Sequence, residues 1–172
     1  DHPLLAVLMN PIHANYHDPL LWEAEGEGQR KDDHGLKCGY TRIRIIRQLP
    51  LPAVTTEHRG RFAIACAATV DADATWRAWA SGWIAGKRRS KRAAQKVAHA
   101  AWDDAAPQRA AAEAARAAMW AVANKSRTAE LEVDSWAAEA AQTAARIGGL
   151  PLIALAEWAV SNSPELPQLL EV

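Results

Sequence analysis

The chain has 172 residues, the size of one ordinary domain, and its 20 Lys and Arg residues equal its 20 Asp and Glu residues in number. A chain of this length can bury most of the apolar surface that its unfolded form exposes. Because there is no net charge, the molecule as a whole has no field that would steer it to nucleic acid or to an anionic membrane. An electrostatic partner would therefore have to recognise a local patch of charge.

The cysteines and the apolar stretches indicate the cellular localisation that we expect for the protein. Cys38 and Cys66 form no disulfide framework, and Cys66 lies in an apolar helical pattern, where we expect a small buried side chain. The apolar stretches 3–9 and 150–160 are too short to span a bilayer, and the first residues lack the basic start of a signal peptide. We therefore expect a cytoplasmic protein with no membrane partner. Since no initiator methionine is present, we also expect a chain that is processed, trimmed or cut from a longer one.

The composition changes character near residue 57. The preceding residues are rich in proline and glycine and hold most of the histidines, whereas the following residues are rich in alanine and tryptophan. This change predicts an irregular N-terminal arm or cap over residues 1–56 and a helical domain over residues 57–172. Three roles stay open for the arm: a strand-containing cap, a partner-binding arm that is ordered only in a complex, or the remnant of another domain.

Within the arm the local signals are short. Residues 4–9 are compatible with a short helix or a strand. Residues 41–47, TRIRIIR, alternate polar and apolar side chains and predict a strand, although adjacent isoleucines at 45 and 46 break the alternation. The preceding acidic residues are predicted to form a solvated loop that contains glycine. They are Glu23, Glu25, Glu27, Asp32 and Asp33.

The second part predicts a mainly α fold: a compact multi-helix bundle or a short helical array, beside an N-terminal segment that can hold a short strand pair. Asp71 or Asp73 is suited to cap the second helix, Pro107 to the first turn of the fourth, and Gly148 to the end of the fifth. The helices are expected at 57–70, 73–85, 88–103, 107–124, 128–147 and 150–161, with a short final helix near 165–170.

Tryptophan recurs along these predicted helices. Trp76, Trp79 and Trp83 recur at a spacing that puts them on one helix face, where they would form either an exposed binding surface or part of the core. Such a stripe normally faces a core, so core packing is favoured. Single tryptophans then recur about once per helix. They are Trp102, Trp120, Trp136 and Trp158.

Positive charge gathers in the run KRRSKR and just after it, while the last third of the chain is acidic. This cluster could contact phosphates, dock on an acidic protein, pair with the acidic third of a second copy in a homodimer, or decorate a solvated loop. For a partner-binding surface we select Arg88, Arg89 and Arg92 together with Trp83. The full set of candidate contacts is Trp83, Lys87, Arg88, Arg89, Lys91, Arg92 and Lys96.

Metal and catalytic motifs are weak. His13, His17 and Asp18 have side chains suited to zinc, but the two histidines would share a face only in a helix, which Pro19 would close, and surface histidines are the favoured interpretation. No catalytic motif or phosphate-binding loop of known spacing is present, so we expect no cofactor and no enzyme activity. A metal-dependent or catalytic protein built around the arm is a third hypothesis.

Three runs together resemble a bacterial and phage family of alanine-rich helical proteins that are often labelled immunity-like: LPAVTTEHRGRFAIACAATV, WRAWASGWIAGKRRSKRAAQKVAHAAW and AAAEAARAAMWAVA. The resemblance covers about residues 50–147. The family pattern is matched at Leu51, Pro52, Arg61, Phe62, Ala63, Cys66, Ala67, Trp83 and Gly86. The chain departs from the family before the Trp-Gly turn, where DADATWRAW stands in place of an Asp-Arg-Pro-Arg-like run.

The resemblance implies an all-helical protein that acts by binding another protein, for example by covering the active site of a toxin. Such a mechanism needs a rigid complementary surface and no chemistry. We therefore expect a non-enzymatic protein-binding module. The alternative is a small nucleic-acid-binding protein, phage-encoded on this hypothesis, that uses the basic cluster at 87–96.

Overall fold

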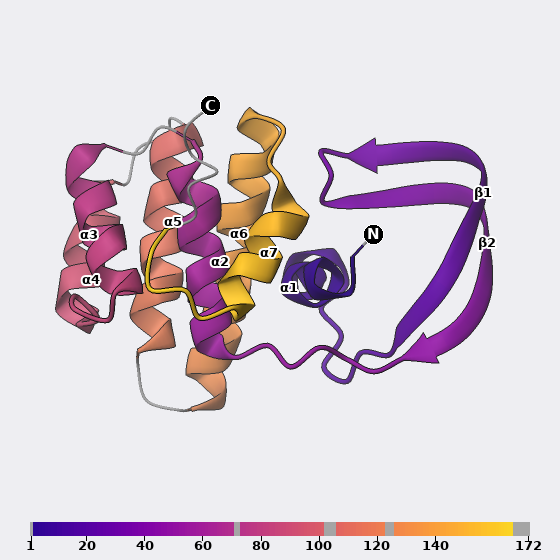
Figure 1. Cartoon of the computed structure of the whole chain (residues 1–172), viewed down its shortest axis with the longest axis horizontal. Coiled ribbons are helices and arrows are strands. Elements are labelled where there is room, and N and C mark those ends of the chain that lie inside the picture. The colour runs from indigo at the N-terminus through magenta and orange to yellow at the C-terminus, as the bar shows by residue number, and fades with distance from the viewer. Residues whose placement is uncertain (1, 71–72, 102–105, 123–125, 167–172) are drawn as a thin grey trace.

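The computed structural model describes residues 2–70, 73–101, 106–122 and 126–166. Over these residues the chain has seven helices and one two-stranded antiparallel sheet (Figure 1), which confirms the predicted, mainly α fold class. The elements follow in the order α1 (Pro3–His13), β1 (Leu21–Asp33), β2 (Lys37–Leu49), α2 (Thr56–Ala68), α3 (Ala74–Ile84), α4 (Lys91–Ala100), α5 (Ala106–Ala121), α6 (Arg127–Ile147) and α7 (Leu152–Val160).

The six predicted helices correspond to α2 to α7, and most of their ends differ by a few residues from the prediction. Helix α4 begins at Lys91, not at residue 88, because the hydroxyl of Ser90 accepts the Ala93 amide as an N-cap. Asp73 caps α3 by accepting the amides of Thr75 and Trp76, as predicted. Residues 165 and 166 are not helical. The predicted helical residues 102–103, which include Trp102, and also 123–124 and 167–170 lie outside the described residues.

Helices α2 and α5 form the centre of the helical body (Figure 1). Every residue of α2 from Gly60 to Ala68 is buried, and α5 contributes a run of buried alanines that faces further alanines of α6. Alanine allows these helix axes to approach closely, and its high helix propensity keeps the segments helical without long side chains. Within the described residues, none of the helices combines the length and apolar character that crossing a bilayer requires.

The tryptophans of α3 fill the space beside this alanine core. Trp76, Trp79 and Trp83 are buried, which confirms the prediction of core packing. The indole N–H of Trp76 donates to the carbonyl of Ala111 on α5 at 2.9 Å, and the Trp76 and Trp79 rings meet edge to face at 5.8 Å. Large side chains on one face of α3 therefore join this helix to the centre of the body.

Residues 4–9, which were compatible with helix or strand, are helical within α1. Pro3 suits the first helical position because its missing N–H needs no partner there. Leu5, Leu8 and Met9 are buried where α1 contacts α6 and α7. The start of the chain is thus part of the helical body.

The acidic segment that was predicted to be a loop is β1, so that prediction was wrong. Its glutamates alternate with Trp22, Ala24 and Gly26, and this alternation pairs with the strand that TRIRIIR correctly predicted inside β2. The register shifts where Glu23 pairs with Arg47 and Ala24 pairs with Ile45, so the adjacent isoleucines mark a bulge. The hairpin bends away from the helices and returns to them at its tip (Figure 1), where Leu36 is buried.

Candidate functional site

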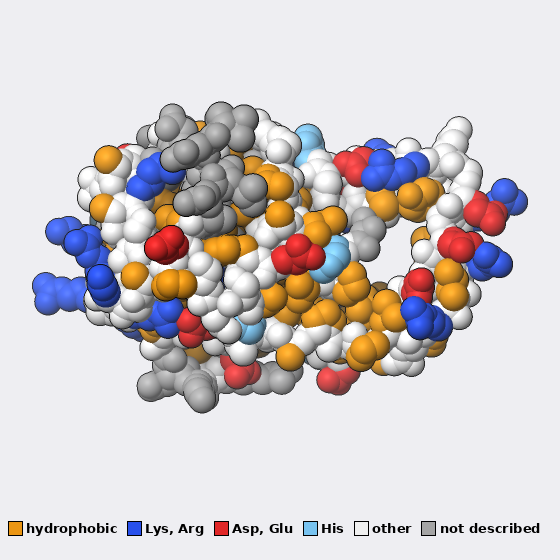
Figure 2. All heavy atoms as spheres, in the orientation of Figure 1, with side chains coloured by type: hydrophobic (Ala, Val, Ile, Leu, Met, Phe, Trp, Pro, Cys, Tyr) orange, Lys and Arg blue, Asp and Glu red, His pale blue; other side chains and the backbone are white. Residues whose placement is uncertain are grey.

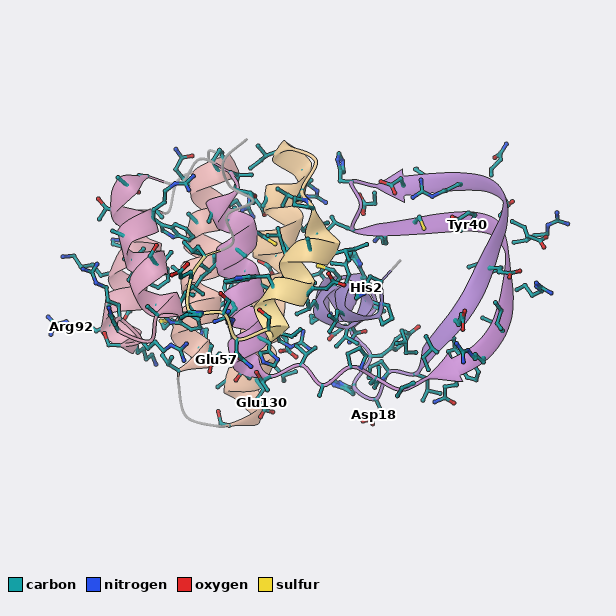
Figure 3. The ribbon with its side chains drawn as sticks, viewed as in Figure 1. His2, Asp18, Tyr40, Glu57, Arg92 and Glu130 are labelled. Atoms are coloured by element: carbon teal, nitrogen blue, oxygen red, sulfur yellow. The ribbon has the colours of Figure 1, made fainter. Side chains whose placement is uncertain are left out.

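The predicted basic cluster spans the turn between α3 and α4. Gly86 ends α3 with a φ of 77°, and the amides of Lys87 and Arg88 both donate to the carbonyl of Gly82. The later cations lie on α4, where Arg92 projects from the end of the molecule opposite the hairpin (Figure 3). The cluster is therefore a turn followed by the first turns of a helix.

Some of these cations are engaged inside the molecule. The guanidinium of Arg89 binds Glu57 at 2.7 Å, donates to the carbonyl of Trp83 at 3.0 Å, and lies 4.7 Å from the centroid of the Trp83 ring. Lys91 places its ammonium 4.9 Å from the centroid of the Trp120 ring. These contacts hold the α3–α4 turn against α2 and α5. Arg89 and Lys91 therefore stabilise the fold.

Trp83 itself is fully buried, so its assignment to an exposed contact surface is corrected to a core position. The reason is steric, because Gly60 on α2 offers no side chain and the indole occupies that space, 3.2 Å from where a Cβ would stand. Four exposed cations remain at this surface, and none of them has an ion pair with a described residue. They are Lys87, Arg88, Arg92 and Lys96.

The weak metal candidates do not form a site. His13 is the last residue of α1, where burial lowers its pKa, and His17 lies in the bend that follows, beside a recess of about 370 Å³. Asp18 is exposed in the same bend, at the lower rim of the molecule (Figure 3). In the part of the chain that the structure describes, no three His, Cys, Asp or Glu side chains are placed to hold a metal ion.

The hairpin carries charge on its outer face. Figure 2 shows acidic and basic side chains along the side of the arch that points away from the helices. Three ion pairs cross from β1 to β2 on this face: Glu23 with Arg47 at 2.6 Å, Glu25 with Arg44, and Glu27 with Arg42 at 3.6 Å. Exposed pairs of this kind add little stability, but they fix the register of the two strands.

The opposite face of the hairpin is apolar and only partly covered. Trp22 is 45% exposed, Ile43 59% and Ile45 57%, and Tyr40 lies over Gly26, where an added Cβ would collide with its ring. Trp22, Tyr40 and Ile43 line a hollow of about 570 Å³, whose far wall is the start of α1. Figure 2 shows the opening between the arch and the helical body. Apolar side chains in such a position are typical of a contact surface.

The edges of the hairpin are also open. Each strand has 13 residues, far more than the usual five or six, and neither outer edge pairs with a further strand among the described residues. A two-stranded sheet is marginally stable by itself, and here it is supported by its ion pairs and by the contact of its tip with the helices. The hairpin is thus the most exposed ordered element of the described chain.

A polar recess of about 610 Å³ lies between α5, α6 and the end of α1. Its wall includes Glu113, a side chain that is only 2% exposed and that accepts a hydrogen bond from Arg109 at 3.1 Å. Burial raises the pKa of the Glu113 carboxyl, and the hydroxyl of Thr143 and the guanidinium of Arg109 offset part of this effect. The group is a buried acid whose charge the fold tolerates poorly.

Compared with known protein families, curated proteins and solved structures, the chain has no match. The resemblance to immunity-like proteins therefore remains a hypothesis from the sequence. The hairpin surface, centred on Trp22, Ile43 and Ile45, was not among the predicted site residues. The signal that could have found it is the period-two alternation of glutamates in residues 21–27, which matches the arginines of residues 42–47.

Proposed function

We propose that the protein is a non-enzymatic protein-binding module that holds its partner with the β1–β2 hairpin. The observation that carries this proposal is the exposure of Trp22, Ile43 and Ile45 on a hairpin that arches away from the described helices and returns to them at its tip, where Leu36 is buried. Burial of such side chains by a partner would remove apolar surface from water, which is the main favourable term in association. Aromatic residues like Trp22 are also the side chains most often found at the centre of interfaces.

The mode of action that fits this surface is occlusion, in which a rigid body covers a functional region of its partner. The alanine-packed helices supply rigidity, and the arched hairpin supplies a protruding, shaped contact element. This mode also agrees with the resemblance to immunity-like proteins.

The test is capture of partners by the tagged protein from lysate, followed by mass spectrometry. A variant with Trp22→Thr, Ile43→Thr and Ile45→Thr keeps strand-forming side chains but removes the apolar face. The matched control changes three apolar residues of the helices that are 41–46% exposed, by Leu131→Gln, Ile147→Gln and Ile153→Gln. We expect a stoichiometric partner to be lost with the hairpin variant and retained with the control. Equal capture by both variants would reject the proposal.

A second candidate function is nucleic-acid binding at the exposed cations of the α3–α4 turn. The observation in its favour is that Lys87, Arg88, Arg92 and Lys96 form no ion pair with a described residue. If all four contacted phosphates of duplex DNA, log affinity would fall with log salt at a slope of about −3 to −4. Fluorescence anisotropy with a labelled duplex measures this slope. Lack of binding at low salt would exclude this function.

A further inference from the structure

Strand β2 differs from strand β1 in the charge of its side chains. Strand β2 carries Lys37, Arg42, Arg44 and Arg47 and no acidic residue, whereas the acidic residues of the hairpin lie on β1. On its other face β2 carries Ile43 and Ile45, opposite Gly26 and Ala24 of β1, and the ring of Tyr40 lies over Gly26 on the same face. A strand that joined β2 would therefore meet arginines on one face and large apolar side chains on the other.

Exposed strand edges are usually protected against further pairing. Common devices are proline, very short strands and bulges. Strand β2 has 13 residues and no proline, and its own bulge lies at Ile46, beyond the apolar stretch. The second register shift of the sheet lies opposite Thr41, where the extra residue belongs to β1, at Gly28 and Gln29. The stretch from Tyr40 to Ile45 therefore leaves backbone donors and acceptors on its outer edge without a strand partner among the described residues.

We infer that the free edge of β2 between Tyr40 and Ile45 accepts an extended segment of a partner protein in which acidic and apolar residues alternate. This inference rests on the proposed function and specifies its partner. The segment adds as a third strand, so that backbone hydrogen bonds supply affinity and its carboxylates lie beside Arg42 and Arg44. Its apolar side chains extend the surface formed by Ile43 and Ile45.

The charges argue against a second copy of the chain as the occupant. Pairing of β2 with β2 of another copy would place arginines beside arginines, and pairing of β1 with β1 would place glutamates beside glutamates. Only β1 against β2 satisfies the charges, and because that contact is heterologous it builds a ring or an open chain of molecules instead of a two-fold dimer. A different protein is therefore the favoured occupant.

The inference is tested with two short fluorescent peptides, one of alternating Glu and Val and one of alternating Lys and Val. The wild-type protein is expected to bind the Glu peptide about tenfold more tightly than the Lys peptide. Amide hydrogen exchange should slow along β2 while β1 stays protected, because the peptide adds to the sheet and does not displace β1. Exposure of β1 amides on binding would overturn the inference.

A charge-swapped hairpin is the decisive variant, because it keeps the cross-strand ion pairs while it reverses the charge of each strand. The changes are Glu23→Arg, Glu25→Arg, Glu27→Arg, Arg42→Glu, Arg44→Glu and Arg47→Glu. Its peptide preference should reverse, and circular dichroism checks that it folds. No preference in the wild type, or the same preference in both proteins, would overturn the inference.

If partner capture still depended on Trp22, Ile43 and Ile45, the proposed function would survive the failure of this inference. Concentration-dependent assembly of the wild type alone, seen by sedimentation, would overturn the choice of occupant.

Discussion

The guanidinium of Arg59 donates to the carbonyl of Val7 at 3.3 Å, and this carbonyl is the helix acceptor that Pro11 cannot reach because proline has no N–H. Arg59 thereby replaces a missing bond of α1 from a different helix. The same side chain binds Asp134 on α6 at 2.6 Å, so that one residue of α2 ties α1 to α6. Burial raises the pKa of the Asp134 carboxyl, and the charge of Arg59 offsets part of this effect.

Replacement of Arg59 should loosen α1. Arg59→Met keeps much of the side-chain volume but leaves Asp134 and the Val7 carbonyl without this partner, so we expect a loss of about 2–4 kcal/mol in the free energy of unfolding. In a Pro11→Ala background the new amide can bond to Val7, and the cost of Arg59→Met should fall by about 0.5–1 kcal/mol. Urea unfolding of the wild type, the two single variants and the double variant measures this coupling. If the two changes were strictly additive in the free energy of unfolding, the bond from Arg59 to the Val7 carbonyl would contribute nothing to stability.

Arg61 is predicted to fasten the end of α7 to α2. It is 2% exposed, lies 4.5 Å from the centroid of the Trp158 ring, and donates to the carbonyls of Ala159 and Ser163. Arg61→Met should lower the free energy of unfolding by roughly 2–3 kcal/mol, because two carbonyls lose a charged donor. Arg92→Met is the control, since that exposed side chain has no ion pair with a described residue. Thermal unfolding of both variants checks the difference, and equal melting temperatures would contradict the assignment.

Glu113 should make stability depend on pH. Its pKa is raised in the folded protein by burial, so its contribution to stability is fully present below the unfolded value of about 4.3 and is lost as pH rises through the folded value. Glu113→Gln removes this titration. The variant should therefore gain stability relative to the wild type as pH rises from about 4 to 8. Urea midpoints across this range measure the gain, and a constant difference between the two proteins would refute the prediction.

We expect the residues of the basic cluster to differ in how much they contribute to stability. Arg89→Ala removes the ion pair with Glu57 and the stacking on Trp83, and a loss of about 1 kcal/mol is expected for these partly exposed contacts. Arg92→Ala should change stability by less than about 0.5 kcal/mol. Chemical denaturation of the two variants measures these changes in the free energy of unfolding. If Arg92→Ala were the more destabilising change, this expectation would be wrong.

The helical part of the fold could be predicted because its signals are local. Alanine content, the Asp73 cap and Gly148 each act within a few residues, and the elements they predict differ from the structure mainly at their ends. The spacing of Trp83 with Trp76 and Trp79 indicated its burial, whereas its selection for the partner-binding surface was wrong. Local propensity and a single apolar face were enough for these helices.

The hairpin could not be predicted in full because its stability is not local. Strand β1 contains glycines and exposed acids that favour a loop when read alone, and it becomes a strand through pairing with arginines about 20 residues later in the chain. The role of Arg89 was missed for a similar reason, since Glu57 lies on another helix. In both cases the structure depends on contacts between segments that are far apart in the sequence.

The hairpin interface is tested most directly by amide hydrogen exchange of the protein alone and in complex with its captured partner. If the hairpin is the contact element, exchange should slow over residues 21–49 and stay unchanged over residues 87–96. Slower exchange confined to residues 87–96, with the hairpin unaffected, would rule out the hairpin as the contact element and assign the interface to the basic cluster.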